Sequence, residues 1–149
     1  MSLAVTPVQG KVELSQFLHF PYRHYSGDPH WVPPLLLDQK EILNRRKHPF
    51  YRQADAEFFL ARRDGEIVGR IAAIHNRAHN DFHGDRVGFF GFFESEPHLE
   101  TARALTDAAA DWCAGRELTS LRGPVNPSTN YECGLLVDGF DQPPAFMMS

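Results

Sequence analysis

Cysteine is scarce in this sequence, and long apolar runs are absent altogether. Only Cys113 and Cys133 occur among 149 residues, too few for a disulfide framework and without a metal-binding spacing. We expect both to be reduced thiols in a cytoplasmic protein. No apolar run approaches the roughly 20 residues that span a bilayer. Residues 1–15 also lack the basic region followed by an apolar one that marks a signal peptide. We therefore expect no membrane partner.

An excess of basic charge is also missing. The chain carries 15 Lys and Arg against 19 Asp and Glu, a net charge of −4. Without a dense basic stripe or a known motif, no nucleic-acid partner is expected. The distribution is uneven, because residues 40–77 hold nine basic and five acidic side chains. This local excess suits an anionic small-molecule ligand, although an ordinary solvated face explains it equally well.

What is present is the composition of a globular domain. The chain is 42% hydrophobic and 23% charged, and its 149 residues are enough for one core. We therefore assign residues 1–149 to a single domain. The sequence stops at the apolar Met147 and Met148 followed by Ser149. Either a last strand ends the domain there, or the chain is the N-terminal part of a longer protein truncated at its C-terminus.

Two helices are predicted in the first third of the chain, after an extended start at residues 4–8. Apolar residues at helical spacing predict the first helix over residues 11–25, with Pro21 ending or kinking it. The second helix spans residues 35–47 and follows Pro33–Pro34, a pair that suits a helix start.

A β-hairpin is the clearest local signal. Residues 56–76 are two apolar runs joined at Asp64–Gly65, a pair typical of a tight two-residue turn. The polar segment 76–85 then predicts a loop that leads into an apolar strand over residues 87–93.

The remaining elements complete an α+β pattern. A helix is predicted over residues 96–114, with Pro97 in its first turn and Gly115 as its stop. Its apolar face would carry Leu99, Ala102, Leu105, Ala109, Trp112 and Cys113. Short strands are predicted at residues 120–125, 135–140 and 144–148. This order predicts a mixed sheet covered by helices.

The strand at residues 87–93 combines four phenylalanines with Gly88 and Gly91. Apolar side chains on both faces predict a strand that is buried on both sides of the sheet. Glycine inside a strand marks a bulge or a close approach by other backbone or by a ligand. Alternatively, the two glycines merely relieve crowding between the phenylalanines, and both interpretations are open at this point.

Three segments carry a family resemblance. They are "DPHWVPPL", "GRIAAIHNRAHN" and "GFFGFFE", the last followed by "RGPVNPSTNYECGLLVDGF". Together they resemble bacterial proteins related to the GNAT superfamily of acyl-CoA N-acyltransferases, over nearly the whole chain. The resemblance implies the α+β GNAT fold, a mixed, mostly antiparallel central sheet flanked by helices. In that fold a splayed strand and the following helix receive the acyl-CoA. Residues 87–93 would be that strand. Members of the group tend to be longer than this chain.

The resemblance also implies site residues. Glu94 takes the place of the carboxylate that deprotonates the amine, and the adjacent phenylalanines would raise its pKa. The alternative is that Glu94 is a solvated strand end or a helix cap. The residues implied in acyl-CoA binding are Gly91, Phe92, Phe93, Ser95 and Glu96. Acetyl-CoA or another acyl-CoA is the implied co-substrate, and no metal is expected.

The segment after the strand departs from the family pattern. GNAT enzymes place a glycine-containing loop there, whose N–H groups bind the pyrophosphate, whereas "ESEPHLETA" has no glycine. Glu94, Glu96 and Glu100 crowd the first helical turn, where carboxylates stabilise the helix but oppose phosphate. Two functions are therefore open: acyl transfer from an acyl-CoA to an amine, or a non-catalytic GNAT-fold domain that binds a small ligand or a protein segment.

Two further groups of residues suggest sites. Residues 126–134 concentrate polar side chains after a strand, but they are also ordinary turn formers. Tyr131 in this loop shares only its residue type with the family's general acid, which lies on a later helix. His75, His79 and His83 are spaced for a metal site on a helix. The asparagines and glycine around them favour a loop instead, so a metal site is not expected.

Overall fold

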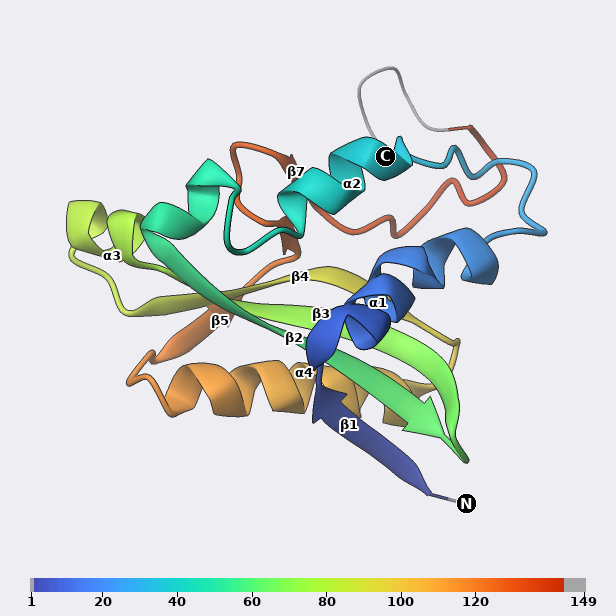
Figure 1. Ribbon diagram of the computed structural model, residues 1–149, viewed down its shortest axis with the longest axis horizontal. Helices are drawn as coiled ribbons and strands as arrows, with labels where there is room; N and C mark the ends of the chain where they lie inside the picture. Colours follow the sequence, from blue (N-terminus) through green and yellow to red (C-terminus); the bar gives the residue numbers. More distant parts are fainter. Residues whose placement is uncertain (1, 144–149) are drawn as a thin grey trace.

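The computed structural model describes residues 2–143, and a five-stranded sheet lies at its centre (Figure 1). The strand order is β1-β2-β3-β4-β5, and all pairs are antiparallel except β4–β5. The strands are β1 (Leu3–Pro7), β2 (Ala54–Arg63), β3 (Glu66–Asn76), β4 (Val87–Ser95) and β5 (Ser120–Arg122). A small second ladder pairs β6 (Val125–Asn126) with β7 (Glu132–Cys133). The predicted mixed, mostly antiparallel sheet is confirmed.

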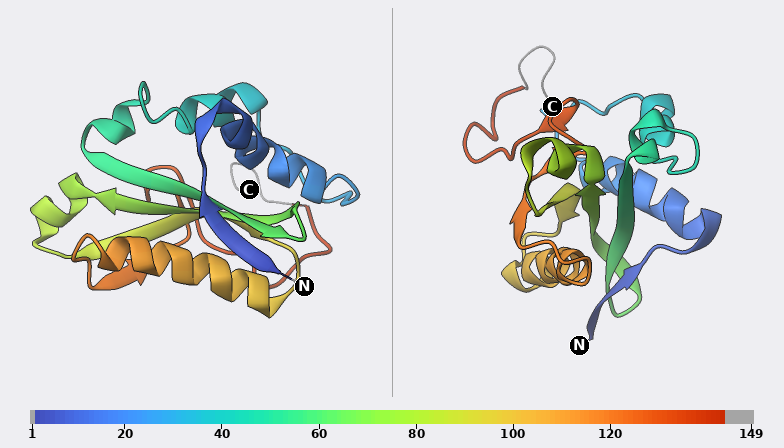
Figure 2. Two further views of the ribbon diagram at one scale, coloured as in Figure 1. Left: turned by 60° about the horizontal axis from the view of Figure 1, so that its bottom comes forward. Right: turned by 90° about the vertical axis from the view of Figure 1, so that its left-hand side faces the viewer.

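Helices cover both faces of this sheet. They are α1 (Gly10–His24), α2 (Leu36–Ile42), the 3₁₀ helix η1 (Pro49–Arg52), α3 (Arg77–His83) and α4 (Leu99–Ala114). Figure 2 shows α1 and α2 on one face and α4 on the other. Within residues 2–143, no helix is both long and apolar enough to cross a membrane.

Each face of the sheet has its own core, and β4 contributes to both. On the α1 face, the ring of Phe17 stacks on Phe58 at 4.8 Å and packs with Phe92. On the α4 face, Leu105 packs under β3, with Phe90 partly buried beside it. The prediction that β4 is buried on both sides is confirmed, although Phe90 and Phe93 are only half-buried.

The predicted hairpin is confirmed in detail. β2 pairs with β3 through a turn at Asp64–Gly65, whose φ angles are 52° and 84°. Two consecutive positive φ angles define a type I′ turn, which matches the right-handed twist of the flanking strands.

The first helix does not end at Pro21, so that part of the prediction is wrong. α1 continues through Pro21 to His24, and the proline itself is buried. Pro21 has no N–H to donate to the carbonyl of Phe17, four residues earlier. The guanidinium of Arg70 on β3 donates to that carbonyl at 2.8 Å instead. A long-range contact thus replaces the missing helical hydrogen bond.

The second predicted helix and the strand after α4 are shorter than expected. α2 ends at Ile42, and η1 follows it after a turn. The strand predicted over residues 120–125 is divided into β5 and β6 by Gly123–Pro124.

α4 begins at Leu99 rather than at residue 96. The N–H of Glu96 donates to the carbonyl of Val68 at 2.8 Å, so the chain continues the pairing with β3 past the end of β4. The helix therefore starts only after Pro97. Its buried residues are Thr101, Leu105, Ala109 and Cys113, whereas the predicted face residue Leu99 is 67% exposed.

The segment predicted as a loop at residues 76–85 contains α3. The side chain of Asn76 accepts a hydrogen bond from the N–H of His79, and Gly84 ends the helix with φ of 67°. Two of the residues that suggested a loop, Asn76 and Gly84, are thus the helix caps. Within residues 2–143, no group of three His, Cys, Asp or Glu side chains is placed to hold a metal ion.

The predicted strand at residues 135–140 is absent from the structure. Those residues follow β7 without pairing to any strand that the structure describes, and Leu135, Leu136 and Val137 are exposed. An isolated apolar run without a neighbouring edge cannot make a ladder. The last predicted strand, at residues 144–148, lies outside the described residues.

Candidate active site

A β-bulge shapes the end of β4. Arg70 faces Glu94 in the β3–β4 register, but Ala72 faces Gly91, so Phe92 and Phe93 together oppose one residue of β3. Phe92 accordingly has a positive φ of 49°. Bulges of this kind bend a strand and re-aim its side chains. Here the bulge immediately precedes Glu94.

Glu94 is half-buried and held by a hydroxyl group. The Tyr25 O–H, just past the end of α1, donates to Oε2 of Glu94. Burial raises the pKa of Glu94, while the Tyr25 hydrogen bond and the charges of Arg70 and His24 offset part of this rise. The carboxylate is therefore a stronger base than an exposed glutamate.

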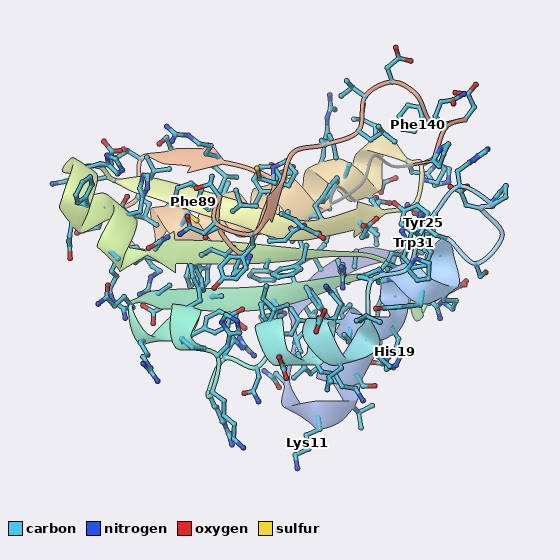
Figure 3. All side chains as sticks on the ribbon, turned by 90° about the horizontal axis from the view of Figure 1, so that it is seen from above. Lys11, His19, Tyr25, Trp31, Phe89 and Phe140 are labelled. Carbon is cyan, nitrogen blue, oxygen red and sulfur yellow. The ribbon has the colours of Figure 1, made fainter. Side chains whose placement is uncertain are left out.

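Aromatic side chains hold Tyr25 in place. Its ring stacks on Trp31 at 5.3 Å, and the two lie together in Figure 3. Tyr22 meets Trp31 edge-on at 5.5 Å and donates its hydroxyl hydrogen to the carbonyl of Pro34 at 2.7 Å. Burial and the adjacent Glu94 raise the pKa of Tyr25, so its hydroxyl remains a hydrogen-bond donor.

Arg70 lies beneath this site as a buried cation. Arg70 is only 5% exposed. Its guanidinium lies 4.8 Å from the ring centroid of Phe17 and 5.8 Å from that of Phe92. Burial lowers the pKa of Arg70 to about 10, which leaves it charged at neutral pH. Its Nε has no hydrogen-bond partner among the described residues.

The two strand glycines are explained by close approach of other groups. A Cβ on Gly91 would lie 1.5 Å from the carbonyl oxygen of Val125, so backbone rather than phenylalanine or ligand occupies that space. Next to it, the N–H of Phe92 donates to Oδ1 of Asn126 at 2.6 Å. A Cβ on Gly88 would lie 2.4 Å from Sγ of Cys113.

The other predicted acyl-CoA residues lie at the far end of β4. β4 pairs with β5 only from Val87 to Phe89. The edge of residues 93–95 that faces away from β3 therefore pairs with no strand among the described residues. Ser95 Oγ donates to the carbonyl of Glu96 at 2.8 Å.

Glu96 belongs to an ion-pair network at the start of α4. Its Oε1 accepts hydrogen bonds from Nε of Arg63 at 3.1 Å and from the hydroxyl of Thr101 at 2.7 Å. Burial acts to raise the pKa of Glu96, but these hydrogen bonds outweigh it, and the pKa is lowered. A surface cavity of about 390 Å³ beside it is lined by Arg63, His98, Leu99 and Glu100. The acidity expected at this helix end is thus partly neutralised.

The remaining candidates lie in other surroundings. Tyr131 packs against His48 and Phe50. His75 is on β3, where Arg116 donates to its Nδ1, whereas the rings of His79 and His83 on α3 lie 4.5 Å apart and are tilted by 44°. Neither group joins the constellation around Glu94.

Sequence reasoning proposed Glu94 as a candidate base but did not single out Tyr25, Trp31 or Arg70, which the structure places around it. Arg70 gave a usable signal, because it is the one charge inside the apolar run "IVGRIAAI". Tyr25 gave none, since it precedes its partner by 69 residues and meets it only through the packing of α1 on the sheet.

Two curated proteins are similar in sequence, while no family model matches. The chain is 39% identical over 147 residues to a bacterial ceramide synthase of Caulobacter vibrioides. It is 35% identical over 138 residues to the protein YghO of Escherichia coli. These alignments cover 98% and 93% of this chain but 38% and 35% of the two relatives. The chain therefore spans less than two-fifths of their length.

Solved structures show the fold. A tandem GNAT protein from the clavulanic acid biosynthesis pathway matches with a TM-score of 0.62 at 19% identity, over 80% of this chain and 35% of that one. A putative acetyl transferase from Pyrococcus furiosus matches with a TM-score of 0.54 at 16% identity, over 93% and 98%. A predicted acetyltransferase with acetyl-CoA from Clostridium acetobutylicum gives 0.55 at 12%, over 81% and 79%. The chain has the GNAT fold.

Proposed function

We propose that this domain transfers an acyl group from an acyl-CoA to the amine of a long-chain amino alcohol, with Glu94 as the general base. The observation that carries the proposal is the half-buried Glu94 carboxylate, held by Tyr25 directly after the bulge in β4. The name of the Caulobacter relative supports the substrate class, because a ceramide is an N-acylated long-chain amino alcohol.

The reaction needs one proton acceptor. The amine nitrogen attacks the thioester carbonyl carbon, the C–N bond forms, and the proton on nitrogen passes to the carboxylate of Glu94. The C–S bond then breaks, and CoA leaves as a thiolate that solvent protonates. A raised pKa suits Glu94 to this role, because a base works best when its pKa approaches the working pH.

Two features of the structure suit acyl-CoA. The unpaired edge of residues 93–95 offers backbone groups to the amides of the pantetheine arm, as a strand edge does to an extended peptide. The cavity at the start of α4 places Arg63 beside the helix N-terminus, where phosphate is favoured, although Arg63 is paired with Glu96 and Glu100 also lines the cavity. Binding there uses no glycine loop.

Exposed apolar side chains are concentrated on the α2 side of the molecule. Of the eleven large apolar residues that are exposed in residues 2–143, seven lie in segments 32–37 and 135–140. They are Val32, Leu35, Leu37, Leu135, Leu136, Val137 and Phe140. Both segments lie on the α2 side of the molecule, uppermost in Figure 1, and Trp31 directly precedes the first. Such clustering suits a ligand with a hydrocarbon chain.

The second candidate is a non-catalytic GNAT-fold domain that binds a ligand or a protein segment. The observation that favours it is the segment between β4 and α4, which has no glycine and contains Pro97. This candidate predicts binding of acyl-CoA or amine without any product.

The test is product formation. The purified chain is incubated with sphinganine and either acetyl-CoA or palmitoyl-CoA, and N-acylated product is measured by mass spectrometry alongside release of free CoA. We expect an amide product that depends on the chain and on both substrates. Binding of either substrate without product would favour the second candidate, and absence of both binding and product would contradict the acyltransferase proposal.

A further inference from the structure

Arg70 is a buried charge with an unusual set of partners. It faces Glu94 directly across the β3–β4 pair. No ion pair joins the two among the described residues, since all such contacts within 4.0 Å involve other groups. Arg70 acts on Glu94 through its charge, which lowers the pKa of the carboxyl group. Because the arginine is buried, solvent screens this attraction less than it would between two exposed groups.

The position of the Arg70 guanidinium is fixed from α1. Its Nη1 donates to the carbonyl of Phe17 at 2.8 Å, and its Cζ lies over the rings of Phe17 and Phe92. That carbonyl is available because Pro21, four residues later, has no N–H. With any other residue at position 21, the helix would offer its own donor to the same oxygen.

We propose that Arg70 is a positioning residue that keeps Glu94 ionised, and that Pro21 holds Arg70 in place by leaving the Phe17 carbonyl without a helical donor. The role of Glu94 in catalysis rests on the proposed function. Its ionisation does not, and can be measured without turnover.

The groups that act on Glu94 come from two elements. At the end of α1, the Tyr25 hydroxyl and the His24 ring lower the pKa of Glu94, and from β3 the charge of Arg70 lowers it as well. Burial acts in the opposite direction and is the largest influence. Tyr22 and Tyr25 also lie near Arg70, but both remain protonated, since burial raises their pKa values. Arg70 is the permanent charge in this set.

The first experiment measures the ionisation of Glu94 itself. The carboxyl carbon is followed by ¹³C NMR through a pH titration in the wild type, Arg70→Gln and Arg70→Lys. We expect the titration of Glu94 to move upward by about one pH unit or more in Arg70→Gln. Arg70→Lys keeps the charge and should move it less. Arg45→Gln is the control, because the guanidinium of Arg45 also lies over a phenylalanine ring, that of Phe58 on β2.

A second variant tests the part played by proline. Pro21→Ala supplies an N–H to the Phe17 carbonyl and so competes with Arg70 for its acceptor. The titration of Glu94 should again move upward, by less than in Arg70→Gln. This variant also keeps the proposal testable if Arg70→Gln does not fold. An unchanged Glu94 titration in folded Arg70→Gln overturns the proposal. An unchanged titration in Pro21→Ala overturns the role of Pro21 and, if Arg70→Gln does not fold, the proposal as a whole.

Turnover separates this inference from the function on which it rests. In an active enzyme, the acid limb of the kcat/KM profile should move to higher pH in Arg70→Gln, with activity recovering at the alkaline end. A shifted Glu94 titration in Arg70→Gln, with no turnover by the wild type or any variant, would contradict the acyltransferase proposal alone. Turnover with an unshifted titration would contradict the role of Arg70 alone.

Discussion

Gly91 shows how closely the chain after β5 packs onto β4. A Cβ at this position would lie 1.5 Å from the carbonyl oxygen of Val125, and backbone cannot move aside as a flexible side chain does. Gly91→Ala should therefore destabilise the fold by about 3 kcal/mol, the upper part of the range for overpacking. Chemical denaturation measures the loss.

Gly27→Ala is the matched control for Gly91. Nothing lies within 4 Å of a Cβ at Gly27, and its φ is not positive, so the substitution should change stability little. Equal stability of the two variants would mean that the segment 123–126 does not approach β4 as described.

Single residues also mark how far sequence alone reaches. Glu94 was a candidate because the family resemblance places a carboxylate at the end of this strand. A close approach was one of two interpretations open for the strand glycines, and the structure shows that approach. What approaches Gly91 is not predictable, since Val125 meets it only after the chain has passed through α4 and β5. The partnership of Tyr25 with Glu94 depends in the same way on the docking of α1.

At the scale of elements, the β2–β3 turn offers a direct test. Gly65 has a φ of 84°, which a β-branched residue adopts only with strain. Gly65→Val should therefore destabilise the protein by about 1–2 kcal/mol. Asp64→Asn should be nearly silent in thermal or chemical unfolding, because asparagine tolerates positive φ and keeps the oxygen that accepts from the N–H of Ser2. A silent Gly65→Val would contradict the turn.

The start of α4 should give a measurable dependence of stability on pH. The pKa of Glu96 is lowered in the folded state, so its carboxylate stabilises the fold above its ordinary pKa of 4.5. That contribution is lost as pH falls through the folded value. Glu96→Gln should cost about 1 kcal/mol at neutral pH, because Arg63 and Thr101 lose a charged acceptor.

The difference between wild type and Glu96→Gln should then shrink as pH falls below 4.5. Unfolding curves across this range provide the measurement. Glu100→Gln is the control, since Glu100 is exposed and lies 3.9 Å from Arg63, and it should have almost no effect. A Glu96 difference that is independent of pH would show that its ionisation does not stabilise the helix start.

The elements also show why local rules fail where they do. Pro21 predicts a helix end unless a distant donor satisfies the Phe17 carbonyl, and Arg70 is that donor. Asn76 and Gly84 are residue types common in loops, and on that ground they indicated a loop. In the structure they occupy the two ends of α3 and cap it. In both cases the missing information is the place of a residue in three dimensions.

For the whole molecule, the order of elements predicted a mixed sheet covered by helices, and the family resemblance specified the GNAT fold. A hairpin, a strand apolar on both faces and a following helix specify a mixed sheet with helices on two sides, as Figure 2 shows. The sequence did not predict which face of the sheet receives which helix at the site. That arrangement brings Tyr25, Arg70 and Glu94 together from three elements.

The most direct test of the account compares turnover with binding in Glu94→Gln. With palmitoyl-CoA and sphinganine, we predict that kcat falls by about 10²–10⁴-fold while the Kd of acyl-CoA, measured by calorimetry, is unchanged. Glu41→Gln, an exposed glutamate on α2, serves as the control and should retain full activity. Turnover by Glu94→Gln at the wild-type rate would contradict the assignment of Glu94 as the general base.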